Sequence, residues 1–211
     1  MTPPSLLIRV AKRKGLRVVA ITDHNRLTIV RSEDVILVPG EEVMTTRGEI
    51  IGLGITEEIP PGLDPFETAD LIEEQGGVVV IPHPFDWFRR RTALFLNGVD
   101  MNRFHVVEVL NARYVDYTPL VRAYTYAKEK ALPMVGSSDA HTPWEVGVAY
   151  TLLPDDIDDV YDVLIALRKG LCKPFGHLSP PLVHIFSPLM RIFHKWGLFK
   201  PHSAPSSVKN R

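Results

Sequence analysis

The sequence contains a single cysteine, Cys172, among its 211 residues, and this scarcity excludes two kinds of structure. An intrachain disulfide needs two cysteines, and a zinc site built from several thiolates is excluded for the same reason. One free thiol is typical of a protein from a reducing compartment. The first residues lack the charged and apolar stretches of a signal peptide, and no uncharged run reaches the roughly 18 residues that span a bilayer. We therefore expect no transmembrane segment and a cytoplasmic location.

Acidic residues are absent from the end of the chain, because none follows Asp162. The last 49 residues carry a formal charge of +8 and the first 162 carry −9, although the net charge is only -1. This asymmetry predicts either an anionic partner for the basic tail or a tail helix whose basic face packs on the acidic body. The Gly-x-x-x-x-Gly-Lys phosphate loop, the Gly-x-Gly-x-x-Gly dinucleotide fingerprint and the Gly-x-Ser-x-Gly elbow are also absent.

Apolar patterns divide the chain into alternating helices and strands. We expect strands at 18–21, 35–38, 49–55, 78–81, 105–110, 133–136 and 147–153, and helices over 3–14, 65–75, 119–131 and 157–169. This alternation predicts βα units, a largely parallel sheet and one α/β domain over residues 1–170. Residues 171–211 are expected to form a basic amphipathic tail, of which the last ten or so residues are disordered.

Histidines and carboxylates stand at the ends of four of these apolar strands. The segments are Thr22-Asp23-His24-Asn25, Gly40-Glu41-Glu42, Pro82-His83-Pro84 and Ser138-Asp139-Ala140-His141. Strand ends converge on one rim of a parallel α/β barrel, so these side chains are expected to hold divalent metal ions that activate water. Each segment alone fits an ordinary turn, but the four together favour a metal site. Mixed nitrogen and oxygen ligands favour Mn, Zn or Fe over Mg or Ca.

Local patterns predict how these side chains point. Glu42, rather than Glu41, is expected to face the rim, because adjacent strand residues point to opposite faces of a sheet. Pro84 favours an extended conformation for His83 and so a stiffly held imidazole. In an extended backbone Asp139 and His141 share a face, which lets both reach one ion or a pair of ions.

The four segments resemble the successive motifs of the PHP (polymerase and histidinol phosphatase) superfamily of metal-dependent phosphoesterases. The similar stretches are "AITDHN", "PGEE", "IPHPF" and "GSSDAH", and "VVEVLNAR" and "WEVGVAYT" look like the small stand-alone members. The resemblance covers about residues 3–170 and implies a distorted (β/α)7 barrel that binds two or three divalent metal ions. The implied metal ligands are His24, Glu42, His83, Asp139 and His141. Glu108 and Asn111 would line the same rim without a ligand role.

The sequence departs from the family at its start. The family begins with a strand that ends in His-x-His, and no such motif precedes Thr2. The barrel therefore lacks its first strand and the ligands on it. Either the true start lies upstream or the metal site is degenerate, and the intact remaining motifs favour the first explanation.

The resemblance implies metal-dependent hydrolysis of a phosphoester in a nucleotide, a sugar phosphate or a short oligonucleotide. The catalytic centre would contain His83, Asp139 and His141, and the partner would be a phosphorylated small molecule or a short nucleic acid. The alternative is a truncated or degenerate module that binds metal or nucleic acid without catalysis.

Three consecutive arginines follow the His83 segment. Arg89, Arg90 and Arg91 are predicted to bind a second phosphate or a nucleotide of the substrate, because guanidinium groups match phosphate oxygens in geometry and charge. A solvated basic loop is the equally weighted alternative.

Overall fold

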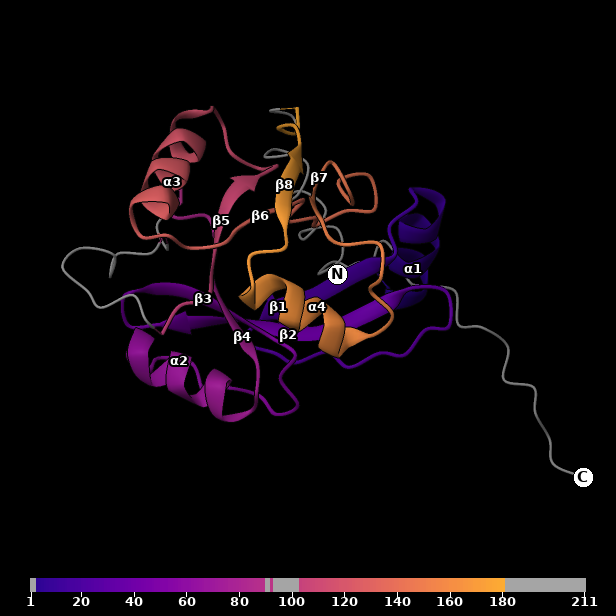
Figure 1. The fold of residues 1–211 in the computed structure, drawn as a ribbon, viewed down its shortest axis with the longest axis horizontal. Coiled ribbons are helices and arrows are strands. Elements are labelled where there is room, and N and C mark those ends of the chain that lie inside the picture. The colour runs from indigo at the N-terminus through magenta and orange to yellow at the C-terminus, as the bar shows by residue number, and fades with distance from the viewer. Residues whose placement is uncertain (1–2, 90–91, 93–102, 181–211) are drawn as a thin grey trace, which may run out of the picture.

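The computed structural model describes residues 3–89, 92 and 103–180, and its main element is a curled sheet of six strands (Figure 1). The strands lie side by side in the order in which they occur in the chain. They are β1 (Val18–His24), β2 (Ile36–Thr45), β3 (Gly48–Leu53), β4 (Val78–Ile81), β5 (Val106–Asn111) and β6 (Met134–Ser137). A separate antiparallel pair consists of β7 (Ala149–Leu152) and β8 (Lys173–Gly176).

The described residues also form four helices, α1 (Pro4–Arg13), α2 (Pro65–Glu74), α3 (Thr118–Glu129) and α4 (Val160–Arg168). Side-chain caps begin two of them: Asp64 accepts a hydrogen bond from the backbone N–H of Phe66 at 2.9 Å, and Asp159 accepts one from that of Asp162 at 2.9 Å. Proline at the first or second position supports the starts of α1, α2 and α3. These short-range signals explain why the helix positions were predictable.

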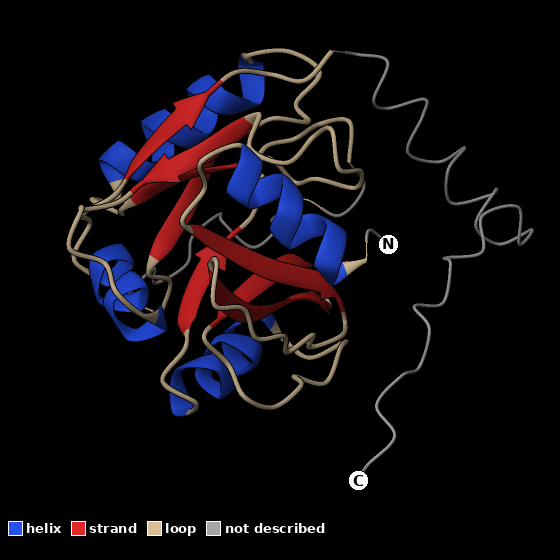
Figure 2. Cartoon of the chain, turned by 90° about the vertical axis from the view of Figure 1, so that its right-hand side faces the viewer, coloured by secondary structure: helices blue, strands red, loops and turns tan. Residues whose placement is uncertain are grey.

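The sheet is largely parallel, as predicted, with one reversed strand. β1 and β2 are parallel, and so are β4, β5 and β6, but β3 runs antiparallel to both of its neighbours. Only Thr46 and Arg47 connect β2 to β3, and a connection this short forces an antiparallel hairpin. The α/β class is confirmed. A closed seven-stranded barrel is not, because within the described residues the six strands form a curled half barrel (Figure 2).

Both faces of the sheet are covered, and the burial of β4 shows this most directly. All four residues of β4 are buried. The second and fourth pack in a cluster that includes Ile72 of α2, and the first and third pack in a cluster that includes Leu164 of α4. A strand covered on both faces reads as a continuous apolar run, which explains why Val78–Ile81 was located correctly from sequence.

The folded part of the chain continues past the predicted end of the domain at residue 170. β8 pairs with β7 from Leu152↔Lys173 to Ala149↔Gly176, a strand that the sequence patterns did not reveal. The rest of the predicted tail, including its expected disordered end, lies outside the described residues, as does Thr2. No helix in the described part of the chain is long and apolar enough to cross a membrane.

Candidate metal centre

Glu42 lies between two histidines at one rim of the sheet. The parallel register of β1 and β2 pairs His24 with Glu42, and His83 follows the end of β4. His24 Nδ1 lies 3.0 Å from Glu42 Oε2, and His83 Nε2 lies 2.9 Å from Glu42 Oε1. Glu41 points to the other face, where its carboxylate accepts a hydrogen bond from the backbone N–H of Ile59 at 3.0 Å.

Burial and hydrogen bonding have opposite effects on the pKa values of His24, Glu42 and His83. Burial alone would raise the pKa of Glu42, but its hydrogen bonds with His24 and His83 outweigh burial and hold that pKa well below its usual range. The hydrogen bond with Glu42 raises the pKa of His24. Burial alone would lower the pKa of His83, but Glu42 raises it overall. Negative charge at Glu42 is therefore matched by imidazoles that favour positive charge.

A second buried carboxylate, Glu49 of β3, belongs to the same cluster. Its oxygens lie 3.7 Å from His24 Nδ1 and 3.7 Å from His83 Nε2. One potential ligand atom from each of His24, Glu42 and Glu49 lies within 4.8 Å of the others. Burial raises the pKa of Glu49, and the neighbouring Glu42 raises it further. Sequence reasoning missed Glu49, because the antiparallel hairpin that turns it toward His24 was not foreseen.

His83 carries an unsatisfied polar atom. The side chain is only 2% exposed, and its Nδ1 has no hydrogen-bond partner. Buried polar atoms are almost always paired, so an orphaned nitrogen on the ring whose Nε2 faces two buried carboxylates needs an explanation. A divalent cation among the carboxylates would be held by Nε2, the His83 atom that faces them, so Nδ1 needs a different partner such as a second ion or a water molecule.

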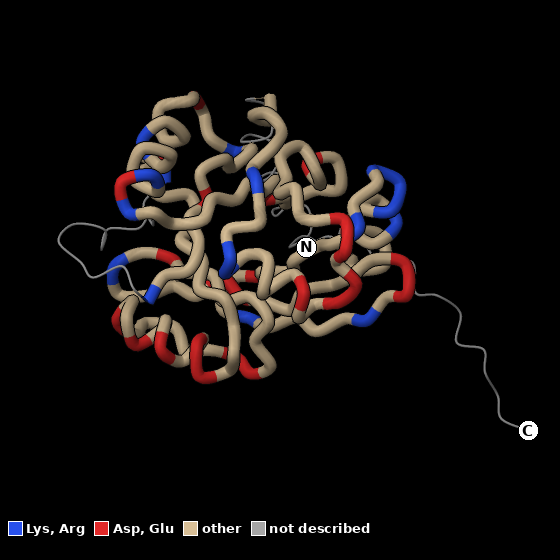
Figure 3. Tube along the Cα trace, in the orientation of Figure 1, with Lys and Arg blue, Asp and Glu red and all other residues tan. Residues whose placement is uncertain are grey.

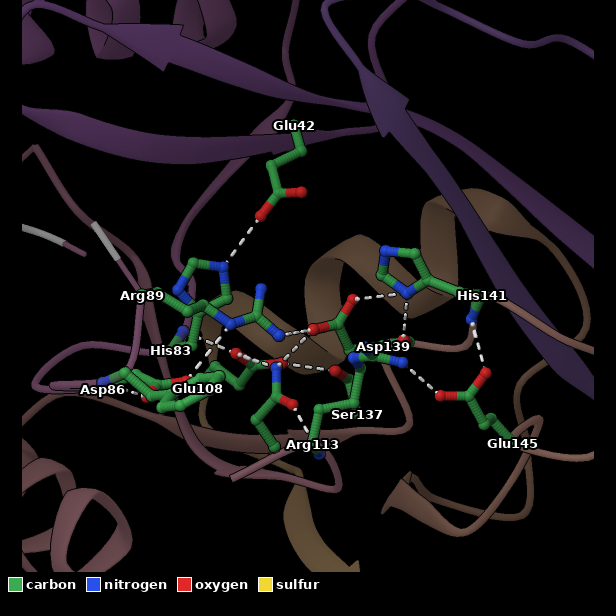
Figure 4. A network of polar contacts seen from close by, with 12 residues as sticks. Glu42, His83, Asp86, Arg89, Glu108, Arg113, Ser137, Asp139, His141 and Glu145 are labelled. Atoms are coloured by element: carbon green, nitrogen blue, oxygen red, sulfur yellow. Dashed lines mark hydrogen bonds and ion pairs between the residues drawn. The ribbon is translucent and has the colours of Figure 1, made fainter. Parts of the chain in front are cut away.

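Asp139 and His141 lie together at the end of β6 and are joined to the His83 side of the rim by Arg89 (Figure 4). His141 Nδ1 lies 3.7 Å from Asp139 Oδ1. The guanidinium of Arg89 donates to Asp139, and its Nε donates to Asp86 at 3.1 Å. Burial alone would raise the pKa of Asp139, but Arg89 and then His141 lower it overall. The arginine therefore occupies one of the carboxylate oxygens that the sequence predicted as a metal ligand.

Glu108 of β5 fixes the loop that carries His83. It is 3% exposed and accepts a hydrogen bond from the backbone N–H of His83 at 2.5 Å. The side-chain amide of Asn111 donates to Glu108 at 3.1 Å and to Asp139 at 3.2 Å, and the hydroxyl of Ser137 also donates to Glu108. Burial raises the pKa of Glu108. Through Glu108 and Asn111, which the sequence predicted to line the rim, these contacts connect the loop of His83 to Asp139.

The backbone at two predicted ligands is not extended, which corrects two of the sequence interpretations. His83 has φ of 29° and Asp139 has φ of 46°, both in the left-handed region that non-glycine residues seldom adopt. The preference that Pro84 imposes on His83 is overridden by the hydrogen bond from the His83 N–H to Glu108. Left-handed backbone held by the surrounding contacts is frequent at functional sites.

A buried ion pair between Arg113 and Glu145 supports the loop that carries His141. Glu145 also accepts hydrogen bonds from the backbone N–H of His141 at 3.1 Å and from the hydroxyl of Thr142 at 2.7 Å. A carboxylate with this many donors fixes the loop conformation, so the position of His141 depends on residues outside the rim.

The structure thus brings the predicted residues together in two adjacent groups. His24, Glu42 and His83 meet directly, whereas Asp139 and His141 form the second group beside Arg89. Arg90 and Arg91 lie outside the described residues.

Comparison with known proteins identifies the family. A family model described as PHP-associated matches residues 119–172. The structure is similar to a two-domain Bacteroides vulgatus protein containing a predicted PHP-like metal-dependent phosphoesterase, with a TM-score of 0.61, 18% identity and coverage of 82% of this chain and 60% of that chain. The chain belongs to the PHP superfamily. The resemblance inferred from the four motifs is therefore confirmed.

Two further solved structures share the fold of this PHP protein. PsfC from Pseudomonas syringae has a TM-score of 0.67 at 21% identity, with coverage of 89% of this chain and 88% of that one. The lesion-specific endonuclease EndoQ from Pyrococcus furiosus has a TM-score of 0.54 at 16% identity, with coverage of 83% and 54%. At these identities the likeness concerns the fold alone.

Two relatives in Methanocaldococcus jannaschii are uncharacterized proteins. MJ0417 is 43% identical over 154 residues, which are 71% of this PHP chain and 63% of that protein. MJ1587 is 42% identical over 120 residues, which are 54% of this chain and 68% of that protein. The chain thus spans less than two thirds of the length of MJ0417.

Proposed function

We propose that this protein hydrolyses a phosphoester with the help of two or three divalent metal ions bound at the rim of the sheet. The observation that carries the proposal is the cluster in which His24 Nδ1 and His83 Nε2 meet two buried carboxylates. The proposed ligands are His24, Glu42, Glu49, His83, Asp139 and His141. The proposed substrate is a nucleotide, a sugar phosphate or a short oligonucleotide. The cytoplasmic location stays a prediction from the sequence.

The residues present fit a divalent cation. Glu42 and Glu49 are both under 10% exposed, and buried carboxylates are costly unless a cation or hydrogen-bond donors balance them. Each of the two neighbouring histidines balances one negative charge only when it is protonated. Two imidazoles with two carboxylates form a nitrogen and oxygen donor set that suits Mn, Zn or Fe.

The chemistry follows from the positions of the protein's own groups. A bound divalent ion lowers the pKa of a coordinated water toward neutrality and neutralises phosphate oxygens. Arg89, held through its Nε by Asp86, is directed at Asp139 and is placed to donate to a phosphate oxygen in the same space. His141 is partly exposed beside Asp139, where a protonated imidazole can donate its proton to the leaving oxygen.

The alternative function is a non-catalytic module that binds metal or nucleic acid. One observation favours it: the Asp139 carboxylate already accepts from Arg89 and, at 3.2 Å, from Asn111. A carboxylate neutralised by an internal guanidinium is a weaker ligand for a second metal ion, and fewer ions would leave the leaving oxygen less well stabilised.

Metal reconstitution with a phosphatase assay separates the two functions. The purified chain is stripped with EDTA, loaded with Mn, Zn or Fe(II), and assayed with bis(4-nitrophenyl) phosphate, glycerol phosphate and nucleoside monophosphates. We expect bound metal by elemental analysis and hydrolysis that Glu42→Gln and His83→Gln abolish. Metal uptake without hydrolysis of any ester would favour the non-catalytic module, and no metal uptake would refute both metal-based functions.

Substrate binding by Arg89 is tested in the same assay. Arg89→Ala should raise KM for a phosphorylated substrate more than it lowers kcat, because the guanidinium is lost from the ground-state complex as well as from the transition state. Arg13→Ala, at an exposed position on α1, is the control for the loss of one positive charge. An unchanged KM in Arg89→Ala would exclude a role in substrate binding.

A further inference from the structure

Exposed apolar side chains gather beside the proposed metal centre. Of the twelve large hydrophobic side chains that are exposed in the described part of the chain, six lie at 87–88 and 115–124. Trp87, Phe88, Tyr117, Val121 and Tyr124 are each between 46% and 60% exposed, and we call these five the aromatic surface. Its size in so short a stretch of chain indicates an interaction site.

The aromatic surface joins two segments that are distant in sequence. Tyr117, Val121 and Tyr124 are spaced four and three residues apart, so they form one stripe along α3. The Trp87 side chain lies near the carboxylate of Asp116, next to Tyr117, and helps to lower the pKa of that carboxyl after the larger effect of Thr118. The Trp87 and Phe88 rings contact each other with centroids 6.0 Å apart. The loop after β4 and the start of α3 therefore form one continuous surface.

This surface begins two residues from a group of the proposed active site. Trp87 precedes Arg89, whose guanidinium donates to Asp139. β4 and β5 are parallel, so the loop after β4 and the loop that leads from β5 into α3 leave the sheet at the same edge. A ligand that reaches from the metal centre across the Arg89 loop would next meet Trp87 and Tyr117.

The α3 side of the surface carries more positive than negative side chains. Arg122, Lys128 and Lys130 are exposed on α3 and at its C-terminal cap, and within α3 the acidic residue is Glu129. Figure 3 shows acidic residues along α2 and basic residues on α3. Arg122 lies over the Phe85 ring at 4.6 Å, and it lines a shallow hollow with Tyr117, Thr118 and Val121. Lys128 lies 5.7 Å from the centre of the Tyr124 ring.

Aromatic faces interleaved with cations match single-stranded nucleic acid. Every base has a π face that stacks on Trp, Tyr or Phe, and each phosphodiester brings a negative charge that Arg or Lys neutralises. A purely apolar protein partner would leave the cations around Tyr117 and Tyr124 without counter-charges. A duplex would offer its bases only at groove edges, where they cannot stack on an exposed ring.

We propose that the aromatic surface binds the bases of a single-stranded nucleic acid whose scissile phosphate lies at the metal centre. This inference rests on the proposed function for the cleavage step but not for binding. It selects a single-stranded oligonucleotide over a sugar phosphate as the substrate class.

The test measures binding without metal, so it does not depend on catalysis. The full chain in EDTA is titrated against fluorescein-labelled oligothymidylate of about 12 nucleotides, close to the length that single-strand-binding domains occupy, and the anisotropy is recorded. Trp87→Ala and Tyr117→Ala should each weaken binding by about 5- to 100-fold, the effect of losing one stacking partner. The matched control is Tyr161→Ala, which removes a 68% exposed ring from α4. It should leave Kd unchanged.

Each contrary outcome is informative. Binding that is absent in the wild type, equal for duplex and single strand, or unaffected by Trp87→Ala and Tyr117→Ala would overturn the inference. A wild-type dimer in light scattering that Tyr117→Ala dissociates, without nucleic-acid binding, would assign the surface to a second copy of the chain instead. Hydrolysis of bis(4-nitrophenyl) phosphate with Mn is measured on the same samples. Oligonucleotide binding without hydrolysis would refute the proposed function but not this surface, and the reverse would refute only the surface.

Discussion

Replacing Glu49 by Gln is expected to raise the stability of the metal-free protein and to remove most of its response to manganese. The substitution keeps the size of a side chain that is 3% exposed. It removes one of the two carboxylates beside His24 and His83. Oxygens of Glu42 and Glu49 lie within 4.8 Å of each other. Two unit charges at about that separation repel by about 3 kcal/mol at an effective dielectric constant of about 20.

The sign of the metal-free effect follows from the pKa of Glu49. Burial, and then Glu42, raise that pKa in the folded protein, so ionisation costs more there than in the unfolded chain. The stability contributed by the protonated form is present at low pH and is lost as the pH rises through the folded pKa. Glu49→Gln avoids this loss at neutral pH. The histidines offset part of the repulsion, so we expect a gain of about 1 kcal/mol, or a Tm increase of about 2–4 °C.

The manganese effect has the opposite sign. Metal at about 100 times its Kd stabilises the folded protein by about 2.7 kcal/mol, which corresponds to a Tm increase of about 5–11 °C for a chain of this size. If loss of one carboxylate ligand raises Kd about 100-fold, the same metal concentration stabilises the variant by only about 0.4 kcal/mol. The variant should then respond by about 1–2 °C.

Thermal unfolding at pH 7.5, after EDTA treatment and with or without MnCl2, measures both effects. Glu57→Gln removes the same charge from an exposed position and should behave as the wild type in both conditions. A Glu49→Gln variant that keeps the full manganese shift would refute the assignment of Glu49 as a ligand. A lower Tm in the metal-free variant would refute the reasoning from charge repulsion.

Three further predictions concern residues outside the metal centre. Gly40→Ala should lower stability to urea by about 1–3 kcal/mol, because the added Cβ would lie 2.7 Å from a backbone oxygen of β3; an unchanged midpoint would contradict this. Arg113→Met should cost about 3–5 kcal/mol, because it leaves Glu145 buried without its cation, and the double variant with Glu145→Met should recover part of the loss. His105 Nδ1 accepts from a β4 backbone N–H, and burial, then a nearby arginine, lower its pKa below 6.5. Its contribution to stability is therefore present above pH 6.5 and lost as the pH falls through the folded pKa, so Tm should fall less between pH 7.5 and 5.5 in His105→Leu than in the wild type.

The elements that sequence located well are those set by local chemistry. The Asp64-Pro65 pair begins α2 for two reasons. The Asp64 carboxylate accepts a hydrogen bond from the backbone N–H of Phe66, and Pro65 lacks the backbone N–H that would have no partner in the first turn of a helix. Val78–Ile81 forms β4 because both faces of that strand are covered. Such signals depend on a few consecutive residues and are visible in one chain.

Features set by contacts between distant segments were not predictable in the same way. The left-handed backbone at His83 contradicts the preference imposed by Pro84, because Glu108, 25 residues later, binds the His83 N–H. β8 is short and mostly exposed, so its pairing with β7 left no apolar pattern to recognise. Local rules fail at these places because tertiary hydrogen bonds outweigh them.

The hairpin between β2 and β3 explains why Glu49 escaped the search for ligands at strand ends. In a parallel barrel each strand contributes ligands from its C-terminal end, and Glu49 stands near the N-terminal end of β3. Because β3 reverses direction, that end lies beside Met44, two residues after Glu42. Adjacent strand residues alternate between faces, so Glu49 shares a face with Glu42 only in this antiparallel register. A one-residue slip of β3 would turn the Glu49 carboxylate away from His24 and His83, and the short connection between the strands is therefore part of the metal centre.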